Sequence, residues 1–584
     1  MDSFEINFFK VFRNIYIKNI IFEHLKLFNQ HYKIFTNSIK QLKVFKYRDY
    51  ITDLVLDNEV QLLKPGDIPN YVNKLYLNEG YFLKDANTIP TSVESLYLLQ
   101  GSALRYMSGY KRVYGENSEN LHLLPSLNGE NKPLLPNILP QSIKTLYLSH
   151  KFNQVLAVGS IPASVEELTI GGSFNKLLEV NVIPNGVKTL RLGGSYNHLL
   201  EKDIIPQSVT ILQLPASYNH PLKPNDIPCG VHTLIFGNHF DQVIKPLDLP
   251  DSITSLQFGI FYNKPFEPNV LPRNLQSIKF GLEFNQVLHK EIFPNTLTSI
   301  KFGDKYNQPI QDSFPSSVVS ILFGDNYNRA FTKNSFPSSV TNISLGKRYN
   351  TEIEESVLPS SLKSIQFGEN FNQKLNRCIP PSCEVVLFGD DFNQDIKEFD
   401  IPFGVKELTF GAKFNRPLDP FVLPNSIKSL KLGYLFTQEL QVNSIPSSVE
   451  NLSMGNLYNN PIGEGIIPEN VHTLNLGSSF NQVLHPKGFP QSLTSLHFGD
   501  SFNKPIDDVF PPSLKNVIMG NSFNQAINLK NTLIEKFFVS GFYFTHTLSE
   551  DNLPASLKLL GINSGYKKLL NLPPSTKILK SDFY

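Results

Sequence analysis

The sequence predicts a solenoid, mainly of β-structure, in which coils of about 22 residues stack so that their strands form one long parallel sheet. The first observation is a proline that recurs in 18 copies from Pro140 to Pro511, with 14 of the 17 intervals equal to 22 residues and 3 equal to 21. The second is an aromatic residue twelve positions after every one of these prolines, followed by Asn in 16 copies. Internal repetition at a short fixed period indicates a solenoid and overrides the four globular domains that 584 residues would otherwise suggest.

Each unit contains one short strand. In the copy that starts at Pro490, Leu493, Leu496 and Phe498 are the apolar residues, and the alternation at the end predicts that Leu496 and Phe498 face inward. The proline fits the turn before the strand, because its ring fixes φ and it needs no ladder partner. Gly499, nine positions after the proline, fits a bend at the end of the strand, where a residue without Cβ turns at little cost.

The aromatic residue and the Asn after it close the unit. The ring of Phe502 is expected to fill the interior of the coil, and Asn503 is expected to hydrogen-bond backbone groups of its own coil and the next. The 21-residue units lose their residue after this pair, while the span from proline to aromatic stays at twelve. We therefore expect a rigid strand segment and an adjustable return segment.

The chain divides into five parts. Residues 1–46 lack the repeat and form an N-terminal helical cap or recruitment segment, because Phe8, Phe12, Ile15, Phe22 and Leu25 follow a helical spacing within a stretch free of Pro and Gly. Residues 47–100 are degenerate repeats with Leu54, Leu75 and Leu96, and 101–130 are a polar loop insertion. The last two parts are the regular repeats, 131–527, and the degenerate repeats with a C-terminal cap, 528–584.

Composition excludes several classes of function. The formal net charge is +1, which favours neither nucleic acid nor an anionic membrane as a partner. Three cysteines in 584 residues argue against a disulfide framework, and no run of apolar residues is long enough for a signal peptide or a membrane span. We expect an intracellular, soluble, cytoplasmic protein without metal or cofactor. The sequence contains none of the common motifs for catalysis, so we expect no enzyme.

The repeat resembles that of the FNIP-repeat family, on the evidence of its aromatic-Asn pair and the Pro and Ile that follow it, as in Tyr306, Asn307, Pro309 and Ile310. The resemblance implies a leucine-rich-repeat-like fold without catalytic residues. The Asn lies two positions later than in leucine-rich repeats, which leaves the details of the turn open. Some members carry an F-box before the repeats; residues 8–27 are helical and apolar but lack a clear F-box pattern.

The residues seven positions after each proline should point outward from the sheet, and they vary. They are candidates for binding a protein partner of unknown identity through the sheet face. The Ser or Thr that occupies position five in 11 of 18 copies has two explanations, a hydroxyl ladder between strands or the centre of a docking surface. Lys279 and Lys301 are on successive units. The candidates are Tyr147, Arg191, Gln257, Lys279, Lys301, Gln366, Lys431 and His497.

The N-terminal segment supports an alternative function. Residues 8–35 carry five basic side chains against Glu23, a net charge of +4 on an amphipathic helix. Such a helix is typical of calmodulin targets, and the resemblance also suggests recruitment of a ubiquitin-ligase subunit through residues 4–45. A recruitment helix must be exposed, whereas a cap must be buried against Leu54 and Leu56. The leading hypothesis remains a non-enzymatic protein-interaction scaffold.

Overall fold

The computed structural model describes residues 15–36, 39–56, 61–77, 81–83, 87–99, 111–113, 133–539, 541, 543–568 and 571–580. Of residues 15–22, 61, 81–82 and 111–113 it describes the backbone alone. Phe8 and Phe12, and the side chains of Ile15 and Phe22, lie outside this description. The predicted fold class is confirmed: the chain is a parallel β-solenoid of about 23 turns of about 22 residues. It comprises two compact units, Met1–Gly281 and Leu282–Tyr584.

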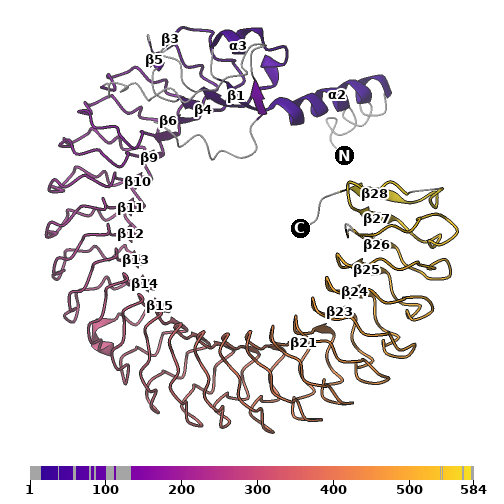
Figure 1. Cartoon of the computed structure of the whole chain (residues 1–584). Coiled ribbons are helices and arrows are strands. Elements are labelled where there is room, and N and C mark those ends of the chain that lie inside the picture. The colour runs from indigo at the N-terminus through magenta and orange to yellow at the C-terminus, as the bar shows by residue number, and fades with distance from the viewer. Residues whose placement is uncertain are drawn as a thin grey trace, which may run out of the picture. The chain divides into compact units, whose positions relative to one another are not determined.

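The first unit begins with helices and continues as coils whose strands form a parallel sheet, apart from two short strands, 61–63 and 81–83, which pair with each other in a second sheet (Figure 1). Its helices are α2 (Ile15–His31), α3 (Ile39–Val44) and the 3₁₀ turn η1 (Arg48–Tyr50). Its strands are β1 (Lys33–Thr36), β2 (Asp53–Leu56), β3 (Gln61–Leu63), β4 (Lys74–Leu77), β5 (Tyr81–Leu83), β6 (Ser95–Leu98), β7 (Lys111–Val113), β8 (Thr145–Tyr147), β9 (Glu167–Thr169), β10 (Thr189–Arg191), β11 (Ile211–Gln213), β12 (Thr233–Ile235), β13 (Ser255–Gln257) and β14 (Ser277–Lys279).

The second unit repeats the same coil after the 3₁₀ turn η3 (Lys290–Ile292). Its strands are β15 (Ser299–Lys301), β16 (Ser320–Leu322), β17 (Asn342–Ser344), β18 (Ser364–Gln366), β19 (Val385–Leu387), β20 (Glu407–Thr409), β21 (Ser429–Lys431), β22 (Asn451–Ser453), β23 (Thr473–Asn475), β24 (Ser495–His497), β25 (Asn516–Met519), β26 (Lys536–Val539), β27 (Leu559–Ile562) and β28 (Lys577–Lys580). Among the described helices, none has the length and apolar character that crossing a bilayer requires.

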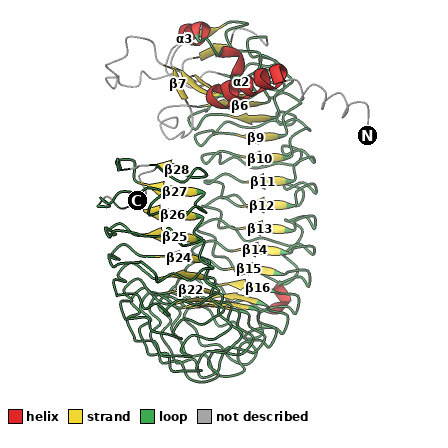
Figure 2. Cartoon of the chain, turned by 90° about the vertical axis from the view of Figure 1, so that its right-hand side faces the viewer, coloured by secondary structure: helices red, strands yellow, loops and turns green. Residues whose placement is uncertain are grey.

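Equivalent residues of successive coils are partners in the sheet. Leu474 of β23 pairs with Leu496 of β24 in a parallel register, and the same register recurs along the stack (Figure 2). Leu496 is fully buried and Phe498 is 4% exposed, which confirms the inward positions. The degenerate repeats within residues 47–100 follow the same register, with Leu54 paired to Leu75 and Leu75 to Leu96.

The interior holds a column of aromatic rings, as the repeat predicted. Phe502 is fully buried, and its ring lies 6.1 Å from those of Phe480 and Phe523 with interplanar angles of 12° and 4°. The predicted asparagine ladder is also present: Asn503 Oδ1 accepts the backbone N–H of Asn524 at 2.9 Å. Each coil thereby satisfies a turn amide of the next one.

Glycine is required nine positions after the proline for a different reason from the bend that the sequence predicted. A Cβ on Gly411 would lie 1.7 Å from the carbonyl oxygen of Gly389, one coil earlier, and Gly499 meets Gly477 at the same distance. Of these, only Gly477 has a positive φ, of 72°. The close approach between the backbones of neighbouring coils therefore leaves no room for a side chain here. The need for glycine comes mainly from this contact and less from its torsional freedom.

A row of serines, two positions after the proline, ties the coils together on the turn before the strand. Ser382 Oγ donates to the carbonyl of Leu362 at 2.7 Å, and Ser426 Oγ donates to that of Val405 at 2.7 Å. Each bond joins one coil to the coil before it, so the row supports the stack in the same way as the asparagine ladder.

The return segment contains a left-handed residue three positions before the next proline. Asn and Asp are frequent there, as in Asn181 with φ of 68°, because they tolerate this conformation. Leu247, Phe399 and Phe421 adopt it as well, with φ of 74°, 69° and 66°, and their side chains are 74%, 60% and 71% exposed. These three apolar residues adopt a strained backbone conformation, and burial of their side chains does not offset the strain.

The N-terminal segment contains a strand that the sequence pattern did not reveal. Residues 33–36 form β1 between the two helices and pair with β2, with Ile34 opposite Leu54 and Thr36 opposite Leu56. On its other side β1 pairs with β7, whose residues 111–113 lie within the segment 101–130 that was predicted to be a loop. Strand β7 therefore covers the edge that β1 would otherwise expose. The rest of 101–130 lies outside the described residues.

Candidate functional site

The outward-facing third residues of the strands form the surface on which the predicted binding residues lie. Arg191, Lys279, Lys301, Gln366 and Lys431 are exposed. Tyr147, Gln257 and His497 are half-buried. Their strand neighbours, such as Leu146 beside Tyr147, are buried, so the alternation places all eight predicted residues on the sheet face.

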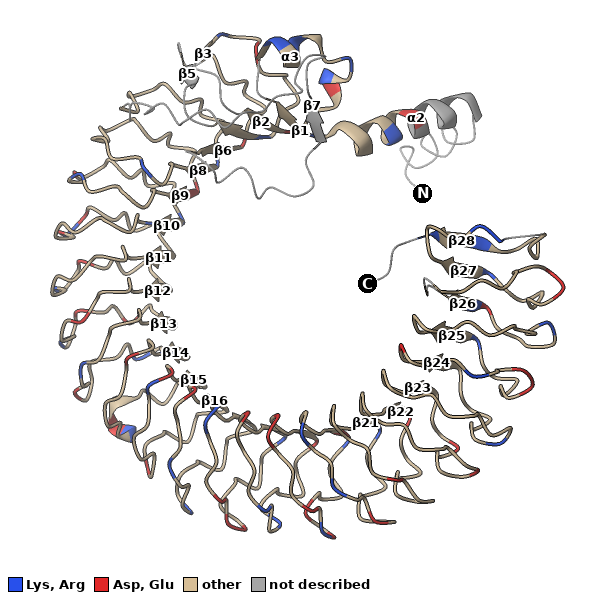
Figure 3. Cartoon of the chain, in the orientation of Figure 1, with Lys and Arg blue, Asp and Glu red and all other residues tan. Residues whose placement is uncertain are grey.

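The structure does not gather these residues into one patch. Tyr147 and Arg191 are two coils apart, and Gln257 follows three coils after Arg191. Lys279, on β14, belongs to the first unit, whereas Lys301, on β15, belongs to the second. Basic and acidic side chains are interspersed in both units (Figure 3). The predicted residues therefore mark a surface and not a focused site.

A focused site exists on the sheet face of the first unit, and we name it the tyrosine strip: Tyr76, Tyr97 and Tyr147. These residues are cross-strand partners on β4, β6 and β8. The rings of Tyr76 and Tyr97 are stacked with centroids 4.4 Å apart and an interplanar angle of 11°, and that of Tyr147 lies 6.2 Å from Tyr97. All three are half-buried, so each presents part of its ring to solvent.

The strip is supported at one end by apolar packing. Phe35 and Val55, at the same outward position on β1 and β2, are 9% and 0% exposed, and Tyr76 and Leu99 pack against them. Burial raises the pKa of the Tyr97 hydroxyl, with smaller contributions from Tyr76 and from nearby carboxylates. The phenol therefore stays protonated at neutral pH and is able both to donate and to accept a hydrogen bond.

Sequence reasoning found Tyr147 and missed Tyr76 and Tyr97. The signal was present, because Leu75 and Leu77 flank Tyr76, and Leu96 and Leu98 flank Tyr97, in the pattern that flanks Tyr147. Extending the repeat register into the degenerate units would have placed both tyrosines on the sheet face.

The Ser and Thr residues five positions after the proline form at least one hydrogen bond between neighbouring strands. Ser277 Oγ donates to Ser255 Oγ at 3.1 Å across β13 and β14. This contact favours the explanation of position five as a ladder that supports the sheet.

The buried cysteines are interior residues. Cys383 takes the place of the aliphatic residue three positions after the proline and is fully buried, and Cys378 is 2% exposed. Burial raises the pKa of the Cys378 thiol to about 12 and that of Cys383 to about 11. Both thiols stay protonated, which makes them poor nucleophiles. In the described part of the chain, no group of three His, Cys, Asp or Glu side chains is placed to hold a metal ion.

One comparison with a solved structure agrees with this architecture. A solved structure described as a novel circular LRR protein, CroV588, aligns with a TM-score of 0.74 and 29% identity over 94% of this chain and 88% of that one. YopM from Yersinia enterocolitica WA-314 aligns at a TM-score of 0.37 and 17% identity over 76% of this chain and 90% of that one.

A relative and a family model match the repeats themselves. A segment of 60 residues is 42% identical to an FNIP repeat-containing protein of Dictyostelium discoideum, and it spans 10% of this chain and 16% of that protein. The model of the FNIP Repeat matches successive segments from 131–173 to 502–533. Together these segments cover residues 131–533 without a gap, which is more than half of the sequence. The chain therefore belongs to the FNIP-repeat family.

Proposed function

We propose that the protein is a non-enzymatic interaction scaffold that binds a protein partner through its sheet face, with the tyrosine strip as the main contact. Tyrosine is enriched among the residues that dominate binding energy at protein interfaces. Rings already stacked on one another lose little conformational freedom when a partner binds. The fold supports the proposal at a coarser level, because leucine-rich-repeat proteins typically mediate protein interactions.

The distribution of perturbed pKa values supports a role without catalysis. Active sites shift the pKa of exposed or cleft-lining groups by several units. In the described residues the largest shifts belong to interior groups, such as Tyr262, Tyr306 and Cys378, and burial is the first cause in each. These shifts have a structural explanation that involves no substrate.

The tyrosine strip gives a direct test. We expect that Tyr97→Ala lowers recovery of the partner in proximity labelling by about tenfold, the loss typical of a central interface aromatic. The matched control is Gln213→Ala, at the same strand position on β11, three coils after Tyr147 and outside the set of predicted binding residues. Equal labelling by both variants, with unchanged thermal unfolding, would contradict the proposal.

The remaining predicted residues extend this surface along both units. Arg191, Gln366 and Lys431 are exposed at the same strand position, so we propose that they adjust specificity and not affinity. Alanine variants at these positions are expected to change partner recovery by less than threefold each. A tenfold loss at any of them would move the main contact away from the strip.

One observation supports the alternative, an adaptor that recruits calmodulin or a ubiquitin-ligase subunit through residues 4–45. In the described part of α2, Leu25 and Phe28 are 50% and 38% exposed and lie three residues apart on one helix face. Burial at this end involves β1 and α3, where Ile39 and Leu42 are 4% and 1% exposed. Capping therefore does not require this face of α2.

The alternative is tested at that face without removing β1. We expect the double variant Leu25→Ser, Phe28→Ser to lose an N-terminal partner while the thermal unfolding of the coils is unchanged. Calcium-loaded calmodulin and a purified ubiquitin-ligase adaptor subunit are the two probes, with Glu23→Gln as the control. Binding of neither probe to the wild-type chain would remove these two partners from consideration.

A further inference from the structure

In the second unit, the residues four positions after five successive prolines, Pro359 to Pro446, form a charged row along the starts of the strands, which we call the strand-start row. Lys363, Glu384, Lys406, Lys428 and Glu450 occupy it on successive coils. Backbone N–H groups join them in order: Lys428 N donates to the carbonyl of Lys406 at 2.7 Å, and Lys406 N to that of Glu384 at 2.8 Å. Neighbours in this row are therefore neighbours in space.

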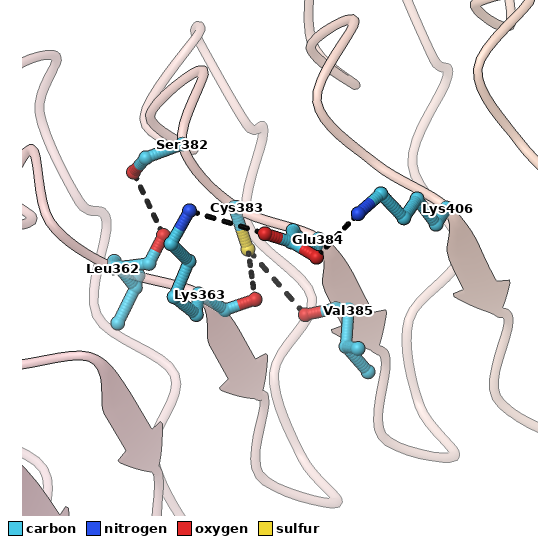
Figure 4. Close-up of polar contacts among 7 residues, drawn as sticks. All are labelled: Leu362, Lys363, Ser382, Cys383, Glu384, Val385 and Lys406. Carbon is cyan, nitrogen blue, oxygen red and sulfur yellow. Dashed lines mark hydrogen bonds and ion pairs between the residues drawn. The ribbon is translucent and has the colours of Figure 1, made fainter.

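The charges in this row are paired except at one step. Figure 4 shows Glu384 between Lys363 and Lys406, with Nζ–Oε distances of 3.1 and 2.6 Å. Lys428 pairs with Glu450 on its other side, at 2.7 Å. Between Lys406 and Lys428 the alternation is broken, because two ammonium groups on adjacent coils have no carboxylate of this row between them.

A hollow opens beside this break. The serine row has Ser382 and Ser426 on the flanking coils, but Gly404 stands between them. A Cβ on Gly404 would lie 2.0 Å from the carbonyl oxygen of Pro381, so the backbone excludes a side chain. The hollow has a volume of about 410 Å³. Its charged lining residues are Lys363, Lys406 and Lys428 together with Glu384, so basic residues outnumber the acidic one.

An exposed aromatic ring completes the lining. Phe403, directly before Gly404, lines the hollow, and its side chain is 73% exposed. A large apolar side chain that exposed gains nothing for the fold. The ring therefore offers an apolar contact surface at the edge of the hollow.

We propose that this hollow binds an acidic side chain of a partner polypeptide, with the carboxylate between Lys406 and Lys428 and a neighbouring apolar side chain on Phe403. A carboxylate placed there accepts a charge-assisted hydrogen bond of about 2.7–2.9 Å from each ammonium group and restores the alternation of the row. Charge complementarity at the break thus defines the occupant.

A polypeptide fits better than a free small carboxylate. Lys406 and Lys428 are 59% and 54% exposed, and ion pairs at such exposure are too weak to immobilise a small molecule. A polypeptide adds contact with Phe403 and with the rim of the hollow. The site belongs to the second unit and shares no residue with the tyrosine strip, so it stands independently of the proposed function.

The experiment selects ligands without assuming a sequence. A library of random dodecapeptides is displayed against the full-length protein, and peptides that also bind the double variant Lys406→Gln, Lys428→Gln are removed. We expect the enriched peptides to carry Asp or Glu beside an aromatic or aliphatic residue. A labelled peptide from this set should bind about tenfold more weakly to the double variant and to Phe403→Ala.

The control is Lys188→Gln, because Lys188 has the same row position in the first unit and pairs with Glu166 at 2.6 Å. This variant should bind the peptide as tightly as the wild type. Enrichment of neutral or basic peptides, equal binding to the double variant, or the absence of any enriched peptide would overturn the proposal. Displacement of the peptide by glutarate at equal concentration would show that a small carboxylate suffices, and would also overturn it.

Discussion

The column of interior rings contains tyrosines whose hydroxyl groups are buried, and Tyr327→Phe tests what those groups cost. Tyr327 is fully buried, with ring centroids 6.1 Å from Tyr306 and 6.2 Å from Tyr349. Its hydroxyl has no hydrogen-bond partner among the described residues. The same position is Phe in other coils, for example Phe371, so the ring fits the column without the hydroxyl.

The expected gain follows from two opposing terms. A buried polar group without a partner costs about 1–3 kcal/mol, and Tyr327→Phe removes that cost. The small void left by the oxygen loses some contacts, which offsets part of the gain by up to about 1 kcal/mol. We therefore expect the variant to be about 1 kcal/mol more stable in this coil. Burial also raises the pKa of Tyr327, because the site disfavours the charged phenolate.

Native-state hydrogen exchange measures this effect in the coil concerned. A stack of coils unfolds without being strictly two-state, so one midpoint does not report a single coil. The backbone N–H of Asn350, which donates to Asn328 Oδ1 at 2.9 Å, should exchange about fivefold more slowly in Tyr327→Phe. The reverse change, Phe392→Tyr, should accelerate exchange in its own coil. Faster exchange in Tyr327→Phe would refute the reasoning, because it would show that the hydroxyl has a stabilising partner.

Four further predictions follow from the fold. Gly411→Ala should destabilise its coil by about 3 kcal/mol in native-state hydrogen exchange, because Cβ would lie 1.7 Å from a carbonyl oxygen, whereas Gly463→Ala, with 3.7 Å to its nearest neighbour, should be neutral. Ser426→Ala should cost about 1 kcal/mol through the lost 2.7 Å hydrogen bond, measured by exchange of the adjacent amides. Phe421→Asn should stabilise its coil by about 1 kcal/mol in native-state hydrogen exchange, since Asn tolerates φ of 66° and the ring is 71% exposed; faster exchange would show that the ring is packed. Burial raises the pKa of Tyr218 from 10 to about 12, so its contribution to stability is present below pH 10 and is lost as the pH rises toward 12; Tyr218→Phe should shift alkaline unfolding, followed by circular dichroism, to higher pH.

The interior of the coil could be predicted from the sequence because it depends on residue types that recur. The aromatic column and the asparagine ladder need a ring and an amide at the same place in every coil, and Phe502 and Asn503 show that pattern directly. The period then fixes which coil each side chain meets. Repetition in one chain thus supplies long-range contacts that a single globular sequence does not reveal.

The features that the sequence did not reveal depend on backbone geometry. Gly411 appears in the sequence as a glycine, but whether it serves a bend or a close contact depends on the neighbouring coil. Strand β7 has no recurring pattern, because its three residues pair through backbone groups with β1. The serine row was visible as a recurring residue, yet its acceptor is a main-chain carbonyl that no pattern identifies.

The candidate site was predicted in part. The alternation of strands placed Tyr147 on the sheet face correctly, and that logic also applies to Tyr76 and Tyr97. The missing step was the register of the degenerate units, in which a proline and two leucines are all that remains of the repeat. The hollow at Gly404 could not be predicted from the sequence. It lies where Gly404 interrupts the serine row, beside the step from Lys406 to Lys428 at which the charges of the strand-start row stop alternating.

Strand β7 changes how the first unit responds to unfolding. A stack of identical coils loses its ends one coil at a time, since each coil contacts only its neighbours. Here residues 111–113 follow β6 in the chain but pair with β1, so they enclose β1, β2, β4 and β6 in one closed connection. Strand β7 has a partner as soon as β1 is formed, and β7 must leave before β1 is released from that side. Fraying of this sheet edge therefore has to begin with β7 and not with β1, because β1 is paired on both sides.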